Sequence, residues 1–147
     1  MDSMTAPSDT RNPVAIVTGA SRGLGRVLAG FLAKQGHALI VTARGEAALR
    51  AAAEEFAATG ADVISIPGDV REEAHRRRLV AAALRAGRLD LLVNNASDLG
   101  DSPLPPLEKA SPEAFRRVLE INTIAPLSLV QDALPLLLRS RGLVVNI

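Results

Sequence analysis

The amino-acid sequence predicts an α/β fold of the doubly wound type, with a parallel sheet between two layers of helices. Nearly continuous apolar runs alternate with amphipathic helical segments, which is typical of strands that are buried on both faces. A glycine-rich octet, residues 18–25, joins the first run to the first helical segment. Because crossovers between parallel strands are right-handed, we expect three layers and the strand order 3-2-1-4-5.

The expected elements follow one another from residue 13 to the last residue. Strands are expected at 13–19, 37–42, 62–66, 89–93 and 142–147, where the chain stops. Helices are expected at 22–35, 46–59, 72–86 and 111–139. Gly36 and Gly87 follow two of these helices, where a left-handed residue commonly ends a helix. Ser111 and Pro112 favour the start of the last helix, as its N-cap and first residue.

The composition argues against several classes of function. The 147 residues suit one domain, expected at 13–147 after a disordered tail at 1–12. The sequence has no Cys, which excludes a disulfide framework and a thiolate nucleophile, and His37 and His75 are too isolated to predict a metal site. A net charge of +1 gives no electrostatic case for nucleic acid. Arg76-Arg77-Arg78 is interpreted as a solvated helix face.

Hydropathy patterning predicts no membrane segment. No uninterrupted apolar run approaches the roughly 18 residues of a transmembrane span, and residues 1–12 contain no apolar signal-peptide core. We therefore expect no membrane partner and a cytoplasmic location.

The glycine-rich octet reads Thr18-Gly19-Ala20-Ser21-Arg22-Gly23-Leu24-Gly25. An apolar strand precedes it, and a helix with apolar residues at 24, 27, 28, 31 and 32, expected to be its buried face, follows it. A helix N-terminus attracts a pyrophosphate, and glycines let the backbone approach it. The sequence therefore predicts a phosphate site, although an ordinary glycine-rich turn is the alternative. The residues expected to bind are Gly19, Ser21, Arg22, Gly23, Leu24 and Gly25.

The spacing T-G-x-x-x-G-x-G resembles that of the short-chain dehydrogenase/reductase family, from Val14 to the last residue. The resemblance implies a Rossmann-type fold, an NAD(H) or NADP(H) cofactor and hydride transfer to or from a carbonyl or alcohol carbon. It also implies a small-molecule substrate and a homo-oligomeric full-length protein. A Rossmann-like methyltransferase is disfavoured, because its glycine pattern and its acid after the second strand are absent.

Arg44 stands where NAD-binding units usually place an acid, about 20 residues past the glycines. A guanidinium can bind a 2′-phosphate bidentately, whereas a carboxylate would repel it. Arg22 is a second cation near the same place, and NADP(H)-using members of the family commonly carry a basic residue at one or both positions. We therefore expect NADP(H) rather than NAD(H). Stacking on the adenine or capping of a helix is the alternative role for Arg44.

Polar residues also end the third and fourth strands. Asp69 can accept a hydrogen bond from the adenine amine, and in the family an Asp-Val pair, here Asp69-Val70, touches the adenine ring. An N-cap role for Asp69 is equally consistent with the sequence. Asn95 and Ala96 belong to the segment 94–97, which resembles the family's N-N-A-G and is expected to tie strand ends together and to face a ribose. Ser97 replaces the glycine and adds a side chain near the substrate.

Asn122 is the one candidate catalytic residue. It follows Phe115, Val118 and Leu119 at helical spacing, which places it on a stripe expected to be buried. Pro126 lacks the N–H that would pair with the Asn122 carbonyl, so we expect a kink and a free carbonyl. In the family, an Asn at this position bridges through water to a catalytic Lys. A structural polar contact is the alternative.

The family's catalytic Ser, Tyr and Lys have no counterparts here, and the sequence contains no Tyr. We therefore expect a fragment of an NADP(H)-dependent oxidoreductase that is inactive by itself. The alternative is a non-catalytic dinucleotide-binding protein that serves as a sensor or partner subunit.

Overall fold

The computed structural model describes residues 12–147, so nearly all of the expected N-terminal tail lies outside the described residues. The expected boundaries differ from the observed ones mostly by one or two residues. The elements are β1 (Val14–Thr18), α1 (Gly23–Lys34), β2 (Ala38–Thr42), α2 (Glu46–Ala57), β3 (Val63–Ser65), α3 (Glu73–Ala86), β4 (Leu91–Asn94), η1 (Leu107–Lys109), α4 (Pro112–Leu119), η2 (Glu120–Ile124), α5 (Ala125–Ser140) and β5 (Leu143–Asn146).

The five strands form one parallel sheet in the order β3-β2-β1-β4-β5, which confirms the predicted topology. In the register of the central strands, Ile16 of β1 lies opposite Ile40 of β2 and Leu92 of β4. All five residues of β1 are buried, as expected of a strand covered on both faces. The order reverses beside β1, and a crevice therefore opens at the carboxyl ends of the strands.

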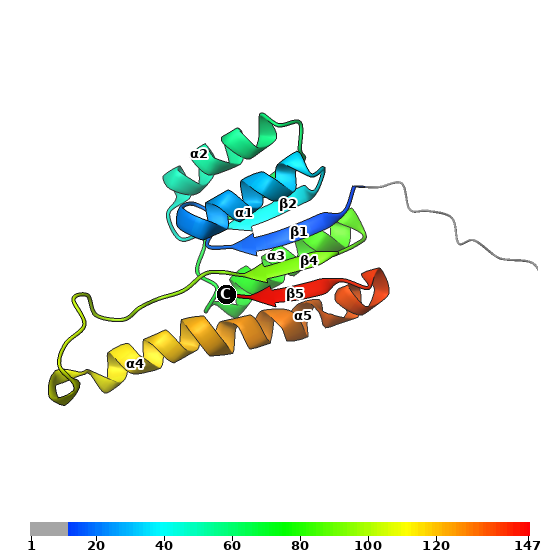
Figure 1. The fold of residues 1–147 in the computed structure, drawn as a ribbon. Coiled ribbons are helices and arrows are strands. Elements are labelled where there is room, and N and C mark those ends of the chain that lie inside the picture. Colours follow the sequence, from blue (N-terminus) through cyan, green and yellow to red (C-terminus); the bar gives the residue numbers. More distant parts are fainter. Residues whose placement is uncertain (1–11) are drawn as a thin grey trace, which may run out of the picture.

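Each face of the sheet has its own apolar core, because side chains alternate along every strand. Ile16 belongs to the core beneath α3 and α5, with Leu79 and Leu129. Val17, one residue later, belongs to the core beneath α1 and α2, with Leu49 and Phe56. Figure 1 shows these two helical layers on opposite sides of the sheet.

The buried face of α1 differs from the predicted one. Leu24, Val27 and Phe31 are 52%, 68% and 60% exposed, whereas Gly25, Ala29 and Ala33 are buried. Leu28 and Leu32, also on the predicted face, are partly buried against the core beneath α1 and α2, so the prediction is wrong only for Leu24, Val27 and Phe31.

The long helix also differs from the prediction. It is α-helical in α4 and α5 but has π-type hydrogen bonding in η2, where the Ala125 N–H donates to the Glu120 carbonyl. The distortion lies beside Pro126, but the expected kink is wrong, because α4 and α5 continue as one rod in Figure 1. Such π segments recur at functional sites.

Within residues 12–147, one helical stretch, Pro112–Ser140, is long and apolar enough to span a membrane by length and composition alone. An 18-residue window within it has a mean hydropathy of 1.4, although no uninterrupted apolar run is as long as a span. Core helices pass the same test, and α5 packs against α3, β4 and β5. The stretch is therefore weak evidence for a membrane segment.

Candidate functional site

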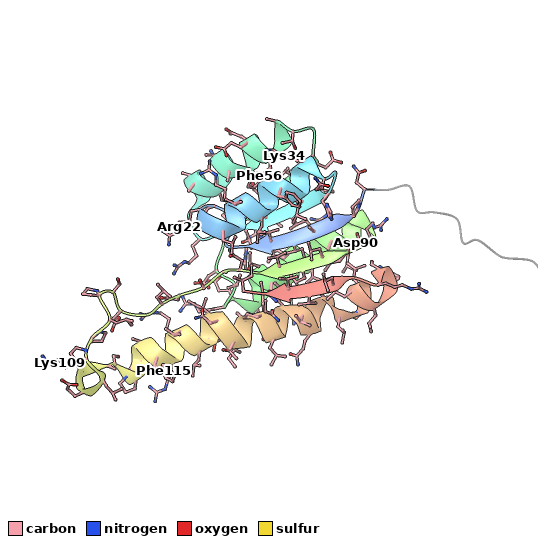
Figure 2. The ribbon with its side chains drawn as sticks, viewed as in Figure 1. Arg22, Lys34, Phe56, Asp90, Lys109 and Phe115 are labelled. Atoms are coloured by element: carbon pink, nitrogen blue, oxygen red, sulfur yellow. The ribbon has the colours of Figure 1, made fainter. Side chains whose placement is uncertain are left out.

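A cavity of about 690 Å³ lies at the carboxyl ends of the strands. The β1–α1 turn, the end of β2, the β3–α3 segment and the end of β4 form its walls. Figure 2 shows Arg22 at this end of the sheet and Asp90 at the opposite end. Every predicted cofactor-binding residue except Gly25 lines the cavity: Gly19, Ser21, Arg22, Gly23, Leu24, Arg44, Asp69, Val70, Asn95 and Ala96.

Gly25 shapes the site without lining the cavity. It is buried, and a Cβ atom there would overlap the Gly19 carbonyl and the Asn95 side chain. Gly19 has a left-handed φ of 68°, and a Cβ on it would lie 2.8 Å from Asn95 Nδ2. The two glycines therefore allow the first turn of α1 to approach the end of β1.

The N-terminus of α1 is open to an anion. Arg22, the N-cap, makes no side-chain capping bond, and the first turn contains no acid. The first N–H groups of a helix have no partners within the helix and carry partial positive charge. Gly23 and Leu24 bring this turn to the wall of the cavity. The geometry suits a phosphate or pyrophosphate group.

Thr18 joins the ends of two neighbouring strands, a role that the sequence analysis missed. Its buried hydroxyl donates to the Val93 carbonyl (3.3 Å) and accepts from the N–H groups of Asn95 (3.0 Å) and Ala96 (2.9 Å). The available signal was a polar residue at the end of an apolar strand. Asn95 adds a second tie, since its Nδ2 donates to the carbonyls of Thr18 (3.0 Å) and Gly19 (3.2 Å).

Two cations, Arg22 and Arg44, stand at the cavity, and the charge of Arg44 contributes to lowering the pKa values of Asp69 and Asp98. Arg22 and Arg44 are exposed, and neither makes an ion pair with any residue in the described range 12–147. Glu46, the acid nearest to Arg44 in sequence, pairs instead with Arg50 at 2.8 Å. The positive charge of Arg44 therefore remains available to an anion.

Asp69 is held by Arg71. Its carboxylate accepts from the Arg71 backbone N–H (2.9 Å) and from Nη2 of the same residue (2.7 Å). The hydrogen bond from the Arg71 side chain is the main reason why the pKa of Asp69 lies below its usual value. The N-cap of α3 is Glu72, so the alternative role of Asp69 as that cap is wrong.

Two buried polar side chains of α3 lie behind the cavity. His75 is 2% exposed, and its Nε2 lies 2.8 Å from the Thr42 hydroxyl. Burial, reinforced by the charge of Arg78, lowers the pKa of His75. Arg76 is 9% exposed, so the expectation of a solvated face over Arg76-Arg77-Arg78 is wrong at its first residue.

Asn122 lies outside the cavity lining, which its neighbour Ile121 joins. It is exposed, as are Phe115 and Leu119, so the predicted buried stripe is wrong. The side of the helix that packs on the protein carries Ala114, Ile121 and other small or branched residues instead.

The oxygen and the nitrogen of the Asn122 side chain are nevertheless both hydrogen-bonded. Its Oδ1 accepts from the Asp98 N–H and its Nδ2 donates to the Asp98 carbonyl, both at 2.9 Å. This reciprocal pair fastens η2 to the segment that follows β4. Ser97, also in that segment, is exposed and lines the cavity.

Comparisons with known proteins point to one family. The family model described as "short chain dehydrogenase" matches residues 13–147. L-fucose dehydrogenase of Mus musculus is 37% identical over 145 residues, which are 98% of this chain and 51% of that protein. The chain therefore spans about half the length of this relative.

Solved structures agree with the fold. An alcohol dehydrogenase of the archaeon Thermococcus sibiricus, complexed with 5-hydroxy-NADP, has a TM-score of 0.82 at 33% identity. The match covers 90% of this chain and 56% of that one. An NAD⁺-bound xylitol dehydrogenase has a TM-score of 0.85 at 28% identity and matches over 93% and 53% of the two chains. Similar structures thus hold either dinucleotide.

Proposed function

Since this chain belongs to the short-chain dehydrogenase family, we propose that it supplies the cofactor-binding part of an NADP(H)-dependent oxidoreductase. The reaction would be hydride transfer between the cofactor and a carbonyl or alcohol carbon of a small molecule. In the whole protein we propose a homo-oligomer located in the cytoplasm.

The observation that carries the cofactor proposal is the guanidinium of Arg44 at the cavity, which makes no ion pair with the residues that the structure describes. NADP(H) differs from NAD(H) by a 2′-phosphate on the adenosine ribose, and Arg binds phosphate with two parallel hydrogen bonds. Arg22 adds a second positive charge at the same cavity. No carboxylate side chain follows β2 directly to accept from ribose hydroxyls, since Thr42 is followed by Ala43, Arg44 and Gly45.

The other lining residues fit the rest of the cofactor. The first-turn N–H groups of α1 would bind the pyrophosphate, and Gly19 would allow close approach. Asp69 would accept from the adenine amine, in competition with Arg71. The nicotinamide supplies or accepts the hydride when the cofactor is bound.

Asn122 would serve the proton relay through its backbone carbonyl. The Asn122 side chain is hydrogen-bonded to the Asp98 backbone. Pro126, four residues further along the helix, has no N–H to donate to the Asn122 carbonyl. A carbonyl left without a helical donor can hold a water molecule.

Calorimetric titration of NADPH and NADH into the 147-residue chain tests the proposal. We expect NADPH to bind more tightly. Arg44→Asp should weaken NADPH binding by about 1.5–3 kcal/mol, or about 10- to 150-fold, because a charge-assisted bond is lost and repulsion is added. NADH affinity should change little.

Arg85→Asp is the matched control, because it makes the same change of charge at an exposed residue that does not line the cavity. Equal NADPH affinity in the wild-type and Arg44→Asp chains would show that Arg44 does not bind the cofactor. Failure of the wild-type chain to bind either dinucleotide would contradict the proposed function.

A further inference from the structure

The buried guanidinium of Arg76 contacts the segment of the cavity wall that would face the adenine. We propose that Arg76 is a positioning residue that fixes Asp69 and Val70 and thereby sets the selectivity of this site for adenine over other purines. The inference rests on the proposed function, because it concerns how the same cavity recognises its dinucleotide.

Arg76 donates to two consecutive carbonyls of this segment. Its Nη1 lies 2.8 Å from the Val70 carbonyl oxygen and 2.7 Å from that of Arg71. A buried charge is costly unless hydrogen bonds or opposite charges offset it. These hydrogen bonds therefore stabilise the orientation in which both carbonyls point toward α3, because losing them would leave the buried charge of Arg76 less compensated.

A third contact anchors the guanidinium from the other side. Arg76 Nε lies 3.6 Å from an Asp132 carboxylate oxygen on α5. Arg76 thus connects the Val70–Arg71 backbone to two packed helices, α3 and α5. The next residue, Arg77, differs in each respect, since it is exposed and pairs with Glu73 one turn earlier on its own helix.

The held segment carries the groups that would recognise the base. Asp69 and Val70 line the cavity, and the lowered pKa of Asp69 means that its carboxylate only accepts hydrogen bonds at neutral pH. Adenine presents an amine donor at position 6, whereas hypoxanthine presents a carbonyl acceptor. A carboxylate in a fixed position accepts from the first and repels the second, but a mobile one can turn away from the mismatch.

The test compares NADPH with reduced nicotinamide hypoxanthine dinucleotide phosphate, titrated into the 147-residue chain. We expect the wild-type chain to prefer NADPH by roughly ten-fold or more, the effect of one misplaced hydrogen-bonding group. Arg76→Met keeps an apolar stem but removes the donors, and it should reduce that preference to about three-fold or less by weakening NADPH selectively. Arg77→Met, the matched control, should leave the preference unchanged.

The outcomes separate positioning from a general loss of structure. Equal weakening of both dinucleotides by Arg76→Met would overturn the inference, as would an unchanged preference. If thermal unfolding shows that the Met variant does not fold, Arg76→Lys decides, because the single nitrogen of a Lys ammonium cannot reach both the two carbonyls, as Nη1 does, and Asp132, as Nε does. A Lys variant with the wild-type preference would then overturn the inference.

The inference and the proposed function can fail separately. A wild-type chain that binds both dinucleotides equally well would overturn the role of Arg76 while leaving the proposed function in place. A wild-type chain that binds neither would overturn both.

Discussion

The two sides of the cavity are built differently. On the β2–β3 side, the segments of Arg44 and Asp69 are both tied to α3. The Thr42 hydroxyl at the end of β2 bonds to His75, and the backbone carbonyls of Val70 and Arg71 accept from Arg76. On the side of η2, the exposed Asn122 is held by one pair of hydrogen bonds to Asp98. Apolar side chains of the helices around η2 are also exposed, and Figure 2 shows Phe115 at the far end from the sheet.

This difference separates recognition from chemistry along the chain. Contacts within residues 12–147 hold the walls that would bind the adenosine half of a dinucleotide. The opposite side contributes one residue, Asn122, to which the family resemblance assigns a part in the reaction. The chain should therefore bind its cofactor far better than it uses it.

The largest expected effect is the absence of any catalysed NADPH oxidation by the 147-residue chain on its own. The 147-residue chain should oxidise NADPH no faster than buffer does in the presence of aldehydes, ketones or quinones. Its sequence contains no Tyr to supply the proton, and Asn122 alone cannot replace one. Absorbance at the NADPH band, followed across a substrate panel, measures the rate. Saturable turnover that depends on the protein would show that the chemistry also lies within this chain.

An effect of intermediate size is expected at Asp69. Arg71→Ala should tighten NADPH binding about three- to ten-fold, because the adenine amine would no longer compete with Arg71 for the carboxylate. The lost ion pair is partly exposed at the surface, so its removal should cost little stability. Calorimetry at neutral pH measures the change, with Arg50→Ala as the control. Weaker binding would instead assign Arg71 a direct contact with the cofactor.

The smallest effect is expected on the opposite side. Asn122→Ala should change NADPH affinity less than about two-fold, because its side chain contacts Asp98 and not the cavity. Amide hydrogen exchange of residues 97–100 should nevertheless accelerate, since the Asp98 backbone loses both partners. A large loss of affinity would mean that the two sides of the cavity do not act independently.

The sequence predicted most of the fold, because strands buried on both faces leave a plain apolar signal. The strand order and the cavity at the carboxyl ends of the strands follow from that signal and from the handedness of crossovers. The glycine octet also predicted that the first turn of α1 lies at this end of the sheet, where Gly23 and Leu24 line the cavity.

The errors arose where a close approach or a long-range contact decides burial. In α1, Gly25 and Ala29 lie against the sheet and turn larger apolar residues outward, which hydrophobic spacing alone cannot show. Arg76 is buried because carbonyls near it in sequence and an acid on α5 compensate its charge. Asn122 is exposed because the side of this helix that packs on the protein carries Ala114 and Ile121 instead.

The Thr18 hydroxyl has a consequence for how the chain folds. It brings together residues about 75 positions apart, so the glycine turn cannot reach its final form until β4 has paired with β1. Closing so long a loop costs chain entropy before any contact is gained, and it therefore falls late among the folding events. A dinucleotide that binds only after β4 has paired with β1 would stabilise the folded state by about 2.7 kcal/mol when its free concentration is a hundred times its dissociation constant. The supply of cofactor would then influence how much folded protein a cell holds.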